Sequence, residues 1–206
     1  MSKKKYLTGN KLVGSNPSIK RVEYDYYATP FESTENLMKK EKFTGNLWLE
    51  PCIGQGHIAK IILKYYPNIK LDGIDIIKRN LIFKNPNLNF QQKDFLKFKT
   101  NNKYDNIITN PPYSIAQKFL EKSMELVKDE GKIALFLKIQ FLEGIKRKQM
   151  FKKYPPKFIH VFSKRQTPMR NGSAFDANGK KWNNTMCFAW FVWEKGNEEF
   201  PIIKWI

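Results

Sequence analysis

The hydrophobic pattern alternates between short apolar runs and segments with helical spacing. Short runs rich in β-branched and aromatic residues predict strands near residues 46–50, 71–75, 89–91, 104–109, 132–137, 158–162 and 185–193. Apolar residues three and four positions apart predict helices over residues 30–41, 58–66, 114–127 and 146–153. Strands that alternate with helices are typical of an α/β fold, in which helices cover both faces of a mostly parallel sheet.

The first predicted strand ends in an acid and is followed by a glycine turn. Glu50 precedes Pro51, and Gly54 and Gly56 then open a helix. Glycines at this point allow the backbone to approach a ligand closely. The turn lacks the third glycine of a dinucleotide fingerprint and the Gly-Lys-Ser/Thr of a phosphate-binding loop. Asp75 ends the next strand, where a carboxylate can accept hydrogen bonds from both ribose hydroxyls, so the sequence predicts a nucleoside site.

The strand at residues 104–109 ends at Asn110-Pro111-Pro112-Tyr113. The prolines fix φ and favour extended backbone in the residues before them. The Asn110 side-chain oxygen and the Pro111 carbonyl can accept hydrogen bonds from an amine, and the Tyr113 ring can stack on a planar group. These features suit a planar substrate that carries an amino group. The same residues also fit an ordinary strand-to-helix turn with Ser114 as the helix N-cap.

These motifs, with Tyr27-Ala28-Thr29-Pro30 ahead of them and Asp94 after the third predicted strand, resemble a known family. The chain resembles the S-adenosylmethionine-dependent amino-methyltransferases, specifically the DNA adenine-N6 type that carries Asn-Pro-Pro-Tyr. The resemblance implies a Rossmann-like class I methyltransferase fold with an antiparallel last strand, and S-adenosylmethionine as the cofactor. A small solitary chain of this kind is similar to phage and mobile-element methyltransferases.

The resemblance also implies roles for single residues. Tyr27 to Pro30 would close over the methionine end of the cofactor, and Asp94 would accept the amino group of its adenine. Ile76 or Phe95 would pack against the adenine ring. The implied cofactor-binding residues are Tyr27, Ala28, Thr29, Pro30, Glu50, Pro51, Gly54, Gly56, Asp75, Ile76, Asp94, Phe95 and Asn110. The implied catalytic residues are Asn110, Pro111, Pro112 and Tyr113.

The chain is strongly basic, with 37 Lys and Arg against 19 Asp and Glu, a formal net charge of +18. Such an excess favours a polyanionic partner, DNA first and RNA as a possibility, although an A+T-rich genome also enriches lysine. The candidate nucleic-acid-binding residues are Lys152, Lys153, Arg165, Arg170, Lys180 and Lys181. We expect a flexible basic arm at residues 1–20 and a methyltransferase domain at 21–206, with 163–184 as a DNA-recognition insert.

Cysteine and histidine are scarce. Cys52 and Cys187 form no metal-ligand pattern and no disulfide framework, so we expect no metal and a reducing, cytoplasmic location. The sequence shows no secretory signal and no apolar run that would cross a membrane. Pro51-Cys52 resembles the nucleophile of cytosine-C5 methyltransferases, but it lies in the cofactor loop, where Cys52 fits a packing role. His57 and His160 also fit structural roles.

The sequence therefore predicts methyl transfer from S-adenosylmethionine to the N6 amino group of adenine in DNA. Because that amine is paired and stacked in a duplex, the base must rotate into the loop formed by residues 110–113. Three alternatives remain: an RNA adenine methyltransferase, a protein glutamine methyltransferase with the same motif, and an inactive partner subunit that binds nucleic acid. The sequence predicts no oligomeric state.

Overall fold

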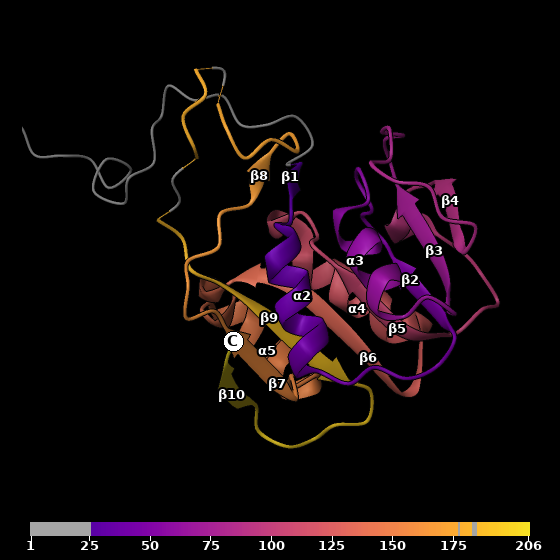
Figure 1. Ribbon diagram of the computed structural model, residues 1–206. Helices are drawn as coiled ribbons and strands as arrows, with labels where there is room; N and C mark the ends of the chain where they lie inside the picture. The colour runs from indigo at the N-terminus through magenta and orange to yellow at the C-terminus, as the bar shows by residue number, and fades with distance from the viewer. Residues whose placement is uncertain (1–25, 177, 183–184) are drawn as a thin grey trace, which may run out of the picture.

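The computed structural model describes residues 26–176, 178–182 and 185–206, so the predicted arm at 1–20 lies outside the described residues. Within those ranges, eight strands form one sheet in the order β10-β7-β9-β6-β5-β2-β3-β4 (Figure 1). Their bounds are β2 Leu47–Glu50, β3 Lys70–Asp75, β4 Leu88–Gln92, β5 Tyr104–Thr109, β6 Val127–Lys138, β7 Phe158–Val161, β9 Phe188–Glu194 and β10 Ile202–Trp205. Only β9 among them pairs antiparallel with its neighbours, β6 and β7. The predicted mostly parallel sheet with an antiparallel strand is confirmed.

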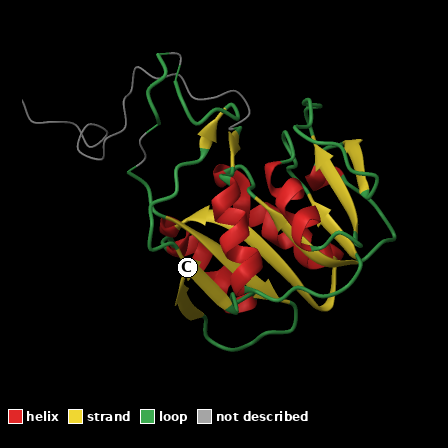
Figure 2. Cartoon of the chain, in the orientation of Figure 1, coloured by secondary structure: helices red, strands yellow, loops and turns green. Residues whose placement is uncertain are grey.

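Helices cover both faces of the sheet (Figure 2). Their bounds are α2 Phe31–Lys40, α3 His57–Tyr65, α4 Ala116–Leu126 and α5 Ile145–Lys153. Buried side chains of α2 and α3 pack with Trp48 and Trp190 on one face, whereas those of α4 and α5 pack with Leu49 and Phe191 on the other. This follows from strand geometry, since successive side chains of one strand point to opposite faces. Within the described ranges, no helix is long and apolar enough to cross a membrane.

The helix predicted over residues 114–127 is present as α4, but the prediction that Gly131 stops it was wrong. A 3-10 turn, Tyr113–Ile115, precedes α4, and β6 begins directly at Val127. The pairing of β5 with β6 shifts register between Tyr104 and Asn106. Gly131 lies at this irregularity, where an added Cβ would stand 2.8 Å from the Asp105 carbonyl oxygen. The glycine therefore permits a close approach of two strands rather than ending a helix.

Two features were missed. The edge strand β10 pairs parallel with β7, and its residues are mostly exposed, so it lacks the apolar alternation that marks a strand. A separate two-stranded sheet joins β1, Tyr27–Ala28, to β8, Met169–Arg170, in antiparallel pairing. Strands of two residues leave no periodic signal in a sequence. This small sheet brings the insert at 163–184 to the motif at residues 27–30.

The order of the large sheet reverses between β2 and β5. From β2 the chain proceeds outward through β3 and β4, and it then returns to place β5 on the other side of β2. Such a reversal opens a crevice beyond the carboxyl ends of the two central strands, where ligands bind in open α/β sheets. Glu50 ends β2, and Asn110 directly follows β5.

Candidate active site

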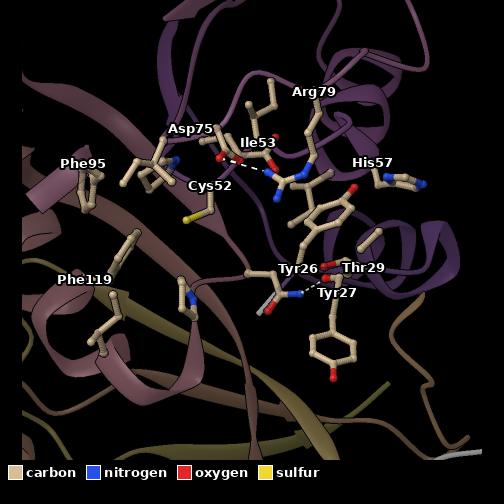
Figure 3. Close-up of a pocket in the computed structure, with 18 of the residues that line it drawn as sticks. Tyr26, Tyr27, Thr29, Cys52, Ile53, His57, Asp75, Arg79, Phe95 and Phe119 are labelled. Carbon is tan, nitrogen blue, oxygen red and sulfur yellow. Dashed lines mark hydrogen bonds and ion pairs between the residues drawn. The ribbon is translucent and has the colours of Figure 1, made fainter. Parts of the chain in front are cut away.

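A cavity lies in this crevice (Figure 3). The predicted site residues that line it are Tyr27, Ala28, Thr29, Glu50, Pro51, Asp75, Ile76, Asp94, Phe95, Asn110 and Pro112. The remaining predicted residues, Pro30, Gly54, Gly56, Pro111 and Tyr113, belong to the same segments but are not part of its lining.

The glycine turn holds the Asp75 carboxylate. Gly54 and Gly56 have φ of 55° and 85°, a left-handed conformation that favours glycine. The Gly54 N–H donates to Asp75 Oδ2 at 2.8 Å, and the Ile77 N–H donates to Oδ1 at 2.9 Å. Arg79 Nη1 lies 3.2 Å from the same Oδ1 (Figure 3). Asp75 is only 8% exposed, so these contacts fix a buried carboxylate at the end of β3.

Three buried polar atoms beside the cavity have no hydrogen-bond partner within the part of the chain that the structure describes. They are Thr29 Oγ1, Glu50 Oε2 and His57 Nδ1. Burial raises the pKa of Glu50 well above its usual 4.5, and the nearby Asp75 carboxylate raises it further. Burial lowers the pKa of His57 to about 4, and Lys60 adds to this shift. Buried polar groups are normally paired, so this end of the cavity is suited to a polar ligand group.

The opposite end of the cavity combines an acid with apolar side chains. Asp94 Oδ1 accepts the N–H of Leu96 at 3.0 Å, which orients the carboxylate at the start of a short 3-10 turn. Phe95 is buried against the ring of Phe119, with centroids 4.9 Å apart. Ile76 lines the cavity and is 56% exposed, so its side chain is the better placed of the two to contact a bound ring.

The Asn110 amide is oriented by main chain. Its Nδ2 donates to the Tyr27 carbonyl at 2.9 Å. Because a carbonyl can only accept, the nitrogen must face Tyr27 and Oδ1 must point the other way. The carbonyl of Pro112 accepts the N–H of Ile115 at 3.0 Å, so this carbonyl is occupied by the 3-10 turn Tyr113–Ile115. The Tyr113 ring packs on Phe188 with centroids 5.9 Å apart, and Lys138 Nζ lies 5.1 Å from the Tyr113 centroid.

Residues 33–155, more than half of the chain, match the family described as methyltransferase small domain. The chain belongs to this family. S-adenosylmethionine is accordingly its cofactor, and the protein is a methyltransferase with a class I fold. No curated protein matches the sequence.

Solved structures of low sequence identity share the fold. The methyltransferase subunit of a type I restriction-modification system from Streptococcus thermophilus has a TM-score of 0.60 at 14% identity, over 83% of this chain and 45% of that one. A proposed RNA methyltransferase from Pyrococcus horikoshii has a TM-score of 0.62 at 13% identity, over 91% of this chain and 99% of that one. A modification subunit of a type I restriction enzyme from Vibrio vulnificus has a TM-score of 0.58 at 13% identity, over 88% of this chain and 47% of that one. This methyltransferase thus spans about half the length of the type I subunits it matches.

Tyr26, Arg79 and His57 also line the cavity, and none was predicted as a site residue. The Arg79 guanidinium lies over the Tyr26 ring, 4.2 Å from its centroid, and reaches Asp75 on its other side (Figure 3). Tyr26 directly precedes a recognised motif, and Arg79 lies four residues after Asp75. Proximity in sequence was therefore the available signal for both. His57 follows Gly56, but its unpartnered nitrogen is visible only in the structure.

The Cys52 thiol lines the cavity of the methyltransferase but is unsuited to nucleophilic attack. Burial raises its pKa well above 9.0, and the carboxylates of Asp75 and Glu50 raise it further. Because the thiolate is the nucleophile, a thiol held protonated is inert. The side chain packs against the core that contains Phe119 and Leu49.

The structure separates the candidate nucleic-acid-binding residues into two groups. Arg165, Arg170, Lys180 and Lys181 belong to the insert, which reaches the cavity through the pairing of β8 with β1. The Arg170 guanidinium lies 5.6 Å from the Trp182 ring centroid, and Arg165 Nη1 donates to the Thr185 carbonyl. Lys152 and Lys153 end α5, and Lys153 borders a depression with Glu194 and Lys195. Glu194 pairs with Lys132, in the first half of β6. This depression therefore lies toward the amino ends of β5 and β6, whereas Asn110 follows the carboxyl end of β5.

Proposed function

We propose that this methyltransferase transfers the methyl group of S-adenosylmethionine to the N6 amino group of adenine in DNA. The observation that carries the proposal is the fixed amide of Asn110 at the border of the cavity. With Nδ2 on the Tyr27 carbonyl, Oδ1 faces away from Tyr27 and can accept a hydrogen bond from a donor on a ligand. A planar substrate with an amino group supplies such a donor.

The cavity residues fit the parts of the cofactor. Glu50, with an unpartnered and buried Oε2, would bind the methionine ammonium, and Thr29 and His57 lie beside the same end. Asp75 would accept the ribose hydroxyls. Because Arg79 contacts Asp75 Oδ1, it would have to share this oxygen with the ribose or release it. Asp94 would accept the adenine amino group, with Ile76 against the ring. The cofactor supplies an electrophilic methyl group on a sulfonium centre.

The protein's own part in the chemistry is to position the amine. The exocyclic nitrogen of adenine is a poor nucleophile, because its lone pair is delocalised into the ring. Hydrogen bonds from its two N–H groups to Asn110 Oδ1 and the Pro111 carbonyl favour a pyramidal nitrogen with a localised lone pair. As the N–C bond forms, the S–C bond would break and leave the sulfur as a neutral thioether, and the methylated nitrogen would lose its surplus proton to solvent after the transfer. Positioning and fixed dipoles then provide the acceleration, without a demand for a strong general base.

The target base must leave the duplex to reach this loop. We expect Tyr113 to stack on the flipped base, and the basic insert to contact the phosphates next to it. Arg165 and Arg170 carry forked guanidinium groups that suit a phosphate or a guanine edge. The net charge of +18 supports a polyanionic substrate over a protein glutamine side chain.

An RNA adenine substrate is the second candidate, because the motif and the charge fit it equally. A radiolabelled methyl-transfer assay decides between them. Duplex DNA, single-stranded DNA, RNA and a glutamine-containing peptide are each incubated with tritiated S-adenosylmethionine, and the products are digested to nucleosides or amino acids. We expect label in N6-methyldeoxyadenosine. Label in the RNA or peptide arm would replace the DNA proposal, and an absence of label with intact cofactor binding would support the inactive-subunit alternative.

A further inference from the structure

The insert does more than extend from the domain, because residues 169–172 contact the strand that borders the cofactor cavity. Tyr27 pairs with Arg170 and Ala28 with Met169 across the two-stranded sheet. The N–H of Asn171 donates to the Tyr26 carbonyl at 3.3 Å. Residues 26 to 28 all line the cavity, so the insert is bonded to one wall of the cofactor site.

Gly172 extends this contact to the glycine turn. Its φ is +80°, and an added Cβ would overlap Gln55 Oε1. Gln55 lies between the two glycines of the turn, and its Oε1 accepts the Tyr26 hydroxyl at 3.1 Å. The Gln55 N–H in turn donates to the Tyr26 hydroxyl oxygen at 3.2 Å. The Gly172–Gln55 contact therefore joins the insert, the glycine turn and Tyr26 in one packed unit.

This unit touches both halves of the reaction site. The Tyr26 ring stacks with Arg79, which pairs with Asp75 on the side assigned to the ribose. The Tyr27 carbonyl orients Asn110 on the side assigned to the target amine. A displacement of β1 would therefore disturb the Tyr26–Arg79 contact and the orientation of Asn110 together. Two paired strands of two residues are marginal by themselves, so further contacts, among them that of the insert with the turn, help to fix the position of β1.

We propose that Gly172 and Gln55 are positioning residues through which the insert holds β1 against the cofactor cavity and so orients Asn110. The proposal rests on the proposed function, because it assigns the two sides of β1 to the cofactor and to the amine. It gives the insert a second role beside contact with nucleic acid. Loss of the Gly172–Gln55 contact should weaken cofactor binding and slow transfer, whereas changes elsewhere in the insert should leave cofactor binding intact.

The chain offers a matched pair of variants. Gly172→Ala adds a Cβ that meets Gln55, whereas Gly179→Ala adds one in the same insert at φ +75° with nothing within 4 Å. Both variants carry the strain of alanine at positive φ, so their difference isolates the contact. By calorimetry with S-adenosylmethionine, we expect Gly172→Ala to raise the Kd by about tenfold or more, which corresponds to about 1.4 kcal/mol. Gly179→Ala should stay within about twofold of the unaltered protein.

A second pair keeps the test decisive if Gly172→Ala folds poorly. Gln55→Ala removes the atoms that the new Cβ would meet, so Gly172→Ala should cost less in that background, and Gln55→Ala alone should also weaken binding. Single-turnover rates at saturating cofactor provide the second readout, and they should fall in Gly172→Ala because Asn110 is displaced. If the unaltered protein binds S-adenosylmethionine and Gly172→Ala, Gly179→Ala and Gln55→Ala all bind it equally, the positioning role is overturned while the proposed function stands. If the unaltered protein does not bind the cofactor, both are overturned.

Discussion

The two sides of Asn110 are built on different principles. On the cofactor side, the acids are buried and held by main-chain groups: Glu50 is 1% exposed, and Asp75 accepts the N–H groups of Gly54 and Ile77. On the side that we propose for the target, the insert presents exposed lysines at positions 180 and 181. A buried carboxylate is costly unless its partners are placed correctly, whereas an exposed lysine needs no fixed partner and acts through a charge that salt screens beyond about 8 Å. The first side therefore depends on geometry and the second on charge.

Asn110 stands at the border of the two sides, and its replacement should have the largest effect. Asn110→Ala removes the oxygen that we propose accepts the target amine, and loss of one such preorganised group costs about 10²–10³ in kcat. Affinity for S-adenosylmethionine should change by no more than a few-fold, because Asp75 and Asp94 are untouched. Steady-state kinetics and calorimetry measure the two quantities.

Asn89→Ala is the matched control for this variant. Asn89 is an exposed residue whose Nδ2 also donates to a single acceptor, Asp72 Oδ1 at 2.9 Å, but it lies on β4 away from the cavity lining. We expect wild-type turnover from it. Turnover in Asn110→Ala within a few-fold of that control would contradict the proposed activation of the amine.

Glu50→Gln tests the buried side through its pH dependence. Because the pKa of Glu50 is raised in the folded protein, the fold holds a proton that the unfolded chain loses near the usual 4.5. Stability from this group is thus highest at low pH and falls as the pH rises toward the folded-state pKa. Each unit of that shift corresponds to about 1.4 kcal/mol. Glutamine cannot ionise, so denaturant unfolding should show that the stability of the variant rises relative to that of the unaltered protein as the pH increases above the usual pKa of 4.5.

The cofactor should reverse this advantage. An ammonium group bound at Glu50 Oε2 favours the ionised carboxylate, so saturating S-adenosylmethionine should stabilise the unaltered protein more than Glu50→Gln at the higher pH. Parallel pH profiles of the two proteins without cofactor would show that Glu50 keeps an ordinary pKa. An equal gain from the cofactor would place the ammonium elsewhere.

The difference between the two sides also explains what the sequence could predict. Glu50 and Asp75 end strands, and Gly54 and Asn110 follow strand ends, so the apolar runs before them were enough to locate these residues in the sequence. The apolar runs likewise predicted the sheet and its covering helices. Contacts between distant segments left no such pattern: the pairing of β8 with β1 and the Gly172–Gln55 contact join residues more than one hundred positions apart.

Charge was the least informative signal about location. The sequence analysis grouped Lys152, Lys153 and the insert lysines as candidate nucleic-acid-binding residues, but position in the sequence does not show at which end of the strands each of them lies. In the structure, α5 ends toward the amino ends of β5 and β6, away from Asn110, whereas the insert contacts the cavity wall through the pairing of β8 with β1. Position along the chain therefore could not show which lysines face the same partner.

The smallest expected effect compares these two lysine pairs, each adjacent in sequence and exposed. Lys180→Ala/Lys181→Ala and Lys152→Ala/Lys153→Ala remove the same charge, so any difference in their DNA affinity reports position alone. Each lost phosphate contact should reduce the slope of log K against log salt by about 0.9. In salt titrations with one short duplex, we expect the insert pair to show the full reduction of this slope and the α5 pair to show a smaller reduction. Equal reductions of the slope would mean that the DNA contacts both the insert and the end of α5. No change in either variant would mean that the +18 charge is compositional, and it would return the protein glutamine substrate to consideration.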